Sequence, residues 1–185
     1  MPGNMRLLNE PSPAEFVATH YADLASLADE SMFLAAVVQI PPLADSDDAQ
    51  WNDYDAWNDV YRLLAAAKVV GLRGWRSGVL PIFERVALGD LNETMESIRH
   101  GPEQAFSNDS DAFLDLLEPL TAHARAGTRQ WSVDELGIYG ELRSLPFILG
   151  AVHDPVDLVR DAARGSLRRL ARHHPAAAAA LADLD

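Results

Sequence analysis

The most distinctive side chains of this sequence lie between Asp45 and Tyr61. The stretch contains six aspartates and no Lys or Arg, and four aromatic residues are interleaved with the acids. Carboxylates attract a basic partner over a distance, and rigid aromatic rings provide contact area at an interface. We therefore predict a surface that binds a partner protein with a basic surface, formed by Asp47, Asp48, Trp51, Asp53, Tyr54, Asp55 and Trp57.

The same stretch has a purely structural explanation. In that case Trp57 and Tyr61 belong to the core, and the aspartates form a solvated face that also stabilises the N-terminus of a helix. The stretch lacks the Gly and the terminal Glu of an EF-hand calcium loop. The six histidines of the chain show no metal-ligand spacing either. The sequence therefore predicts no metal site and no cofactor.

A second group of candidate residues lies near the C-terminus. Arg164, Arg168 and Arg172 recur at every fourth position, which places them on one face of a helix. Such a face could hold a phosphate or an acidic partner. The alternative is that cations near the end of a helix stabilise it through the helix dipole, and that Arg160 pairs with Asp157 or Asp161. We treat the three arginines as an alternative, anion-binding site.

Composition narrows the possible functions. The net charge of −13 repels the phosphates of nucleic acids, so a protein is the favoured partner. The chain has no cysteine, which rules out disulfides, thiolate metal sites and cysteine nucleophiles. The first ten residues do not form a signal peptide, and the apolar run Met32–Ile40 is too short to span a bilayer. We expect a cytoplasmic protein without catalytic residues.

The elements that must position these side chains are predicted to be helices. Apolar residues recur at helical spacing, as in Trp57, Val60, Tyr61 and Leu64, and sustained period-2 alternation is absent. Eight or nine short helices are expected. Gly101-Pro102 and Gly127 are predicted to end two of them, and Ser132 with Glu135 is predicted to begin another as a capping box.

Residues 145–171 resemble a HEAT repeat. Leu145-Pro146-Phe147-Ile148-Leu149 match its first helix, Asp154-Pro155 match the turn, and Val159-Arg160-Asp161-Ala162-Ala163 with Leu167 and Leu170-Ala171 match the second helix. Asp154 is expected to cap the second helix, and small Ala162 and Ala163 to permit close helix approach.

The resemblance covers about a sixth of the chain, and one helix pair cannot bury both of its faces. It therefore implies a single helical-repeat domain over residues 1–185: an all-α, short, curved stack of antiparallel helix pairs, the HEAT-like α-solenoid. It also implies a non-catalytic protein–protein interaction module. The acidic character of this small protein suggests a sharper version, in which it neutralises a basic partner such as a toxin, as immunity proteins do. The alternative is a HEAT-like enzyme, either a lyase or a DNA-repair glycosylase, that binds its substrate on the concave face.

Overall fold

The fold is helical throughout the part of the chain that the computed structural model describes, residues 13–43, 54–89 and 93–184. No strand occurs in these ranges, which confirms the predicted all-helical class. No helix among them is long and apolar enough to cross a membrane. In chain order the helices are α1 (Pro13–Ala25), α2 (Glu30–Val37), α3 (Tyr54–Arg73), α4 (Val79–Phe83), α5 (Glu93–Ala105), α6 (Ser110–Leu120), α7 (Ala126–Tyr139), α8 (Leu145–Ala151), α9 (Asp157–Ala171) and α10 (Pro175–Ala182).

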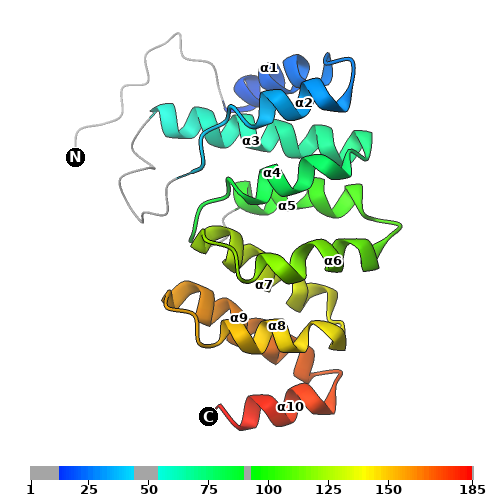
Figure 1. Ribbon diagram of the computed structural model, residues 1–185. Helices are drawn as coiled ribbons and strands as arrows, with labels where there is room; N and C mark the ends of the chain where they lie inside the picture. Colours follow the sequence, from blue (N-terminus) through cyan, green and yellow to red (C-terminus); the bar gives the residue numbers. More distant parts are fainter. Residues whose placement is uncertain (1–12, 44–53, 90–92, 185) are drawn as a thin grey trace, which may run out of the picture.

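The helices stack in sequence order from α1 and α2 at one end to α10 at the other (Figure 1). Helix α3 packs between α1 and α5, and α9 packs between α7 and α10. The shorter helices α6 and α8 lie against α7 and α9, respectively. Short 3₁₀ turns at Arg76–Gly78 and Leu142–Ser144 lead into α4 and α8. Packed helix pairs with brief connections therefore build the molecule.

One apolar core runs through most of this stack. It contains the largest fully buried side chains, among them Trp131, Phe33, Phe83 and Phe113. The ring of Phe83 meets the rings of Phe113 and Trp131 edge-on, at centroid distances of 6.4 and 6.0 Å. Aromatic pairs favour this geometry because the positive ring edge meets the negative ring face. Side chains from α4, α6 and α7 are thus joined at the centre of the stack.

Helix α5 does not end at Gly101-Pro102, as the sequence predicted, but continues to Ala105. Proline removes one helical hydrogen bond, which usually interrupts a helix. Here the same segment packs very closely on α3: a Cβ atom on Gly101 would lie 2.0 Å from the carbonyl oxygen of Ala67. The glycine is required by this contact between helices, and it does not mark a helix end.

The predicted boundaries around α7 were also wrong. Gly127 lies in the first turn of α7, where a Cβ atom would meet the carbonyl oxygen of Val86 at 2.6 Å. Ser132 and Glu135 lie inside the helix and are buried. The Ser132 hydroxyl donates to the carbonyl of Thr128 at 2.8 Å instead of capping a terminus. Packing against the neighbouring segments thus determines where these polar residues lie.

The two helices predicted within residues 145–171 are present as α8 and α9. Ala163, Leu167 and Leu170 are buried, as predicted, and Arg160 pairs with Asp157. Asp154 does not cap α9, whose N-cap is Val156 with no side-chain hydrogen bond. The Asp154 carboxylate instead accepts hydrogen bonds from the Val156 amide at 2.9 Å and from the Arg129 guanidinium at 2.6 and 2.9 Å.

Candidate partner-binding surfaces

Only part of the predicted acidic and aromatic surface can be placed. Asp47, Asp48, Trp51 and Asp53 lie outside the described residues. Tyr54 and Asp55 begin α3, but their side chains lie outside that description as well. Trp57 is the member whose side chain is described. The binding role of this group stays a prediction.

Trp57 belongs to a small aromatic cluster where α1 crosses the start of α3. Its ring stacks on Tyr61 with centroids 5.6 Å apart, and Tyr61 in turn stacks on Phe16 of α1 at 6.0 Å. Trp57 and Tyr61 are half-buried. The cluster therefore holds α1 against α3 and still leaves part of both rings at the surface, which fits the structural explanation and the binding explanation together.

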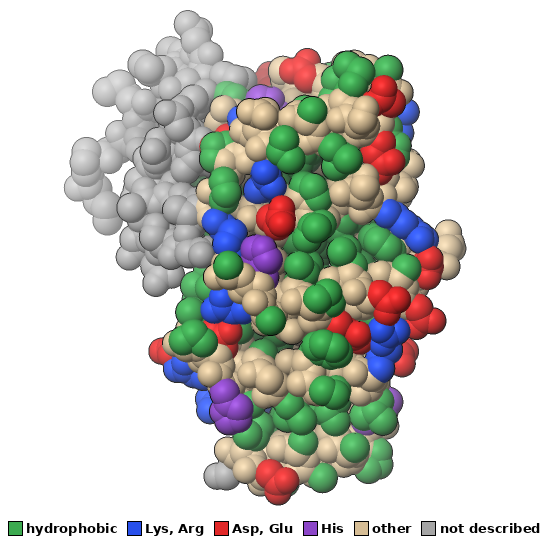
Figure 2. Space-filling model, viewed as in Figure 1, with side chains coloured by type: hydrophobic (Ala, Val, Ile, Leu, Met, Phe, Trp, Pro, Cys, Tyr) green, Lys and Arg blue, Asp and Glu red, His purple; other side chains and the backbone are tan. Residues whose placement is uncertain are grey.

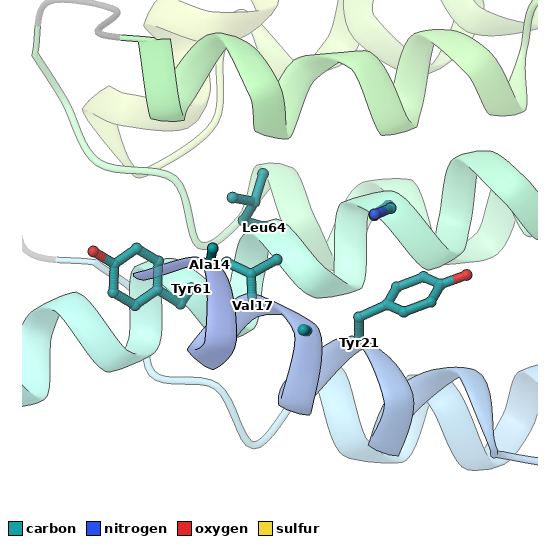
Figure 3. A pocket seen from close by; sticks show the side chains of 7 residues that line it. Ala14, Val17, Tyr21, Tyr61 and Leu64 are labelled. Carbon is teal, nitrogen blue, oxygen red and sulfur yellow. The ribbon is translucent and has the colours of Figure 1, made fainter. Parts of the chain in front are cut away.

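A pocket of about 480 Å³ lies beside this cluster, between α1 and α3 (Figure 3). Helix α1 supplies Ala14, Val17, Ala18 and Tyr21, and α3 supplies Tyr61, Leu64 and Lys68. Apolar pockets of roughly 300 to 1,000 Å³ are typical ligand sites. The Lys68 ammonium lies 4.8 Å from the centroid of the Tyr21 ring. The pocket is thus apolar with a cation at its rim, and Tyr61 joins it to the acidic and aromatic stretch.

Arg164 and Arg168 are exposed on one face of α9, and Arg172 is exposed at the C-cap of this helix. None of them makes a hydrogen bond or an ion pair with any described residue. Every other arginine of the described ranges has such a partner: Arg62, Arg73, Arg76, Arg85, Arg99, Arg125, Arg129, Arg143, Arg160 and Arg169. These three guanidinium groups differ from the rest in being available to a partner.

The structure also contains buried charges that the sequence analysis missed. Arg99 of α5 pairs with Glu135 of α7 at 2.5 Å, and Arg169 of α9 pairs with Asp134 at 3.3 Å. Burial raises the pKa of Glu135 to about 7, although the Arg99 charge acts in the opposite direction. Burial likewise raises the pKa of Asp134, against the attraction of Arg169. Charged residues spread along a helix usually indicate that the helix is exposed to solvent. The sequence of α7 therefore did not indicate that Asp134 and Glu135 are buried.

The described residues contain no candidate metal site, and the face shown in Figure 2 carries charges of both signs. Within residues 13–43, 54–89 and 93–184, no three His, Asp or Glu side chains are grouped to hold a metal. On the face shown in Figure 2, acidic and basic side chains are interspersed with hydrophobic ones.

Comparison with known proteins gives no further assignment. No protein-family model matches the chain, and neither the curated proteins nor the solved structures contain a match.

Proposed function

We propose that this protein is a non-catalytic protein-binding module, built as a HEAT-like stack of helix pairs, that neutralises a basic partner in the manner of an immunity protein. The observation that carries the proposal is the apolar pocket between α1 and α3 (Figure 3). It shares Tyr61 with the acidic and aromatic stretch. A partner could therefore be attracted by the aspartates and anchored by an apolar side chain in the adjoining pocket.

The spacing of equivalent residues supports a helical-repeat architecture. The first residues of α7 and α9, Ala126 and Asp157, are 31 positions apart. Arg129 and Arg160 show the same separation, and both bind Asp154: Arg129 binds its carboxylate and Arg160 donates to its carbonyl at 2.7 Å. Repeats of about this length that contact only their neighbours are typical of helical solenoids.

The pocket has suitable dimensions and chemistry for an anchor residue. Its lining by Val17, Leu64 and two tyrosine rings can desolvate one large apolar or aromatic side chain, the type that dominates binding energy at interfaces. The first turns of α3, where the acidic stretch ends, also supply the pocket residue Tyr61. We expect the partner to present an apolar residue flanked by Lys or Arg.

An enzymatic role would need a reactive group that a substrate can reach. Glu135 is the strongest candidate, because burial raises its pKa to about 7, as in many catalytic acids. Its side chain is only 1% exposed and it is paired with Arg99. The site is thus closed to a substrate in this conformation, and we favour the binding role.

The experiment uses two exposed alanines of α1 that lie one turn apart. Ala18 lines the pocket and Ala22 does not. After a pull-down from the source organism has identified a partner, its binding kinetics are measured with the parent, with Ala18→Arg and with Ala22→Arg. The pocket model expects Ala18→Arg to weaken binding at least about tenfold and Ala22→Arg to leave it nearly unchanged. Equal affinities for all three proteins would contradict the model.

A further inference from the structure

The exposed arginine face of α9, formed by Arg164, Arg168 and Arg172, lies at the other end of the stack from the pocket. We propose that this face binds an acidic segment of a second protein. This goes beyond the proposed function, because it assigns a separate surface and a partner of opposite charge. The protein would then hold two partners, a basic one at α1 and α3 and an acidic one at α9.

These guanidinium groups have no intramolecular role that the described residues show. The chain has 28 acidic residues, and the ten other described arginines all use carboxylates or carbonyls as partners. Two of those ten, Arg160 and Arg169, lie on α9 itself and are held by Asp157 and Asp134. The helix thus contains both kinds of arginine, and the unpaired ones share one face.

The length of the arginine face matches a short acidic segment. Residues four apart on a helix rise about 6 Å, so the face from Arg164 to Arg172 is about 12 Å long. Three carboxylates on an extended or helical segment match that length, and a guanidinium can bind each carboxylate through two parallel hydrogen bonds. Asp161 lies at the start of the same face, three residues before Arg164, and it weakens the positive potential there. Arg168 and Arg172 should therefore contribute most.

The charge of the whole molecule favours a protein over a nucleic acid. A net charge of −13 opposes the long array of phosphates on DNA or RNA, whereas a short acidic segment needs to approach only α9. Salt sensitivity does not separate the two ligands, because both interactions are electrostatic. A direct comparison of ligands does.

The test measures fluorescence anisotropy of a labelled oligoglutamate peptide with the full chain at low salt, in parallel with an oligolysine peptide and a short DNA duplex. The variant combines Arg164→Gln, Arg168→Gln and Arg172→Gln. A charge-matched control combines Arg62→Gln, Arg73→Gln and Arg76→Gln, which removes three arginines that have partners. We expect the α9 variant to bind oligoglutamate roughly tenfold more weakly and to melt close to the parent, and the control to change in binding by less than about twofold.

Four results would overturn the proposal. A lack of saturable oligoglutamate binding would mean that the face has no affinity for acidic segments. Equal losses in the two triple variants would assign the binding to overall charge. Tighter binding of the DNA duplex, abolished by the α9 substitutions, would assign the face to nucleic acid. A large drop in melting temperature for the α9 variant alone would give the arginines the stabilising role at the helix end and would equally count against a docking surface.

Discussion

Arg99 of α5 donates from its Nε atom to Oε1 of Glu135 of α7, and the two side chains are only 9% and 1% exposed. Removing charges from water is costly, so a pair of this kind is tolerated only where each charge has its partner. The pair joins α5 to α7 across the middle of the stack. Glu103 and Asp134 add further negative charge around Glu135. The ionised form of Glu135 is therefore disfavoured in the folded protein.

This arrangement predicts a pH dependence of stability. The folded-state pKa of Glu135 is raised from 4.5 to about 7, so in this interval the folded protein binds more protons than the unfolded chain. The free energy of unfolding should therefore be highest below pH 4.5 as far as this group is concerned, and should fall as the pH rises through about 7. Urea denaturation at about pH 5 and about pH 8 measures the difference.

Glu135→Gln provides the control, because the amide does not titrate. We expect this variant to be close to the parent in stability at about pH 5, where Glu135 is protonated and the amide resembles it, and to be the more stable of the two at about pH 8. Its stability should therefore vary less with pH than that of the parent. If the parent and the variant showed the same slope, another group would be responsible.

Gly101→Ala should destabilise the protein by about 2 kcal/mol or more, because the added methyl group collides with the backbone of α3. Gly165→Ala is the matched control: Gly165 lies within α9, and a Cβ atom there would meet nothing within 4 Å. It should gain about 0.5 to 1 kcal/mol from the better helix propensity of alanine. Thermal melts of both variants test the prediction, which fails if both substitutions destabilise the protein or both stabilise it.

Leu167→Ala should cost about 2 to 5 kcal/mol, because Leu167 is fully buried in the core and its removal leaves a cavity. Leu72→Ala is the comparison, since Leu72 is 56% exposed and should change stability by less than about 0.5 kcal/mol. Chemical denaturation gives both values. A melting curve of Leu167→Ala that overlaid the parent would mean that α9 is packed differently.

The acidic stretch predicts a separation of binding from folding. Replacing Asp47, Asp48, Asp53 and Asp55 with Asn should slow association with a basic partner and flatten its salt dependence, with little change in melting temperature. Surface-based kinetics at low and physiological salt measure this. Unchanged association rates would remove the aspartates from the binding surface.

Trp51→Ala tests the anchoring half of the same surface. If the ring of Trp51 is an anchor, its loss should mainly speed dissociation, because desolvated contact is lost and long-range attraction is kept. The same kinetic assay separates the two rates. An unchanged dissociation rate would remove Trp51 from the binding surface.

Much of the fold was predictable from the sequence because apolar periodicity is a local property. The buried side chains of α3, such as Val60, Leu63 and Val70, recur at the spacing that a half-buried helix requires. Helix α7 was not predictable in the same way. Gln130, Asp134 and Glu135 are polar and buried, and their partners come from distant segments or other helices. Such pairing depends on tertiary structure.

The same distinction between local pattern and tertiary structure applies to the candidate sites. The shared face of Arg164 and Arg168 on α9 was predictable, because residues at every fourth position of a helix share a face wherever the helix lies; the binding role of this face stays a prediction. The pocket between α1 and α3 was not found, since it depends on how Val17 and Tyr21 meet Leu64 across two helices. The spacing of residues in the sequence does not show where two helices cross.

The polar contacts at α7 also affect how the protein unfolds. Thr128 donates to the carbonyl of Phe83 at 2.8 Å, Gln130 bonds both backbone groups of Gly89, and Arg125 donates to the carbonyls of Leu43 and Val86. Directional bonds of this kind fix the register between the first five helices and the last five, which an apolar seam alone would not do. A linear stack would otherwise fray from its ends one pair at a time. Here the two halves should unfold as one cooperative unit, with the amides of α7 the slowest in the chain to exchange with deuterium.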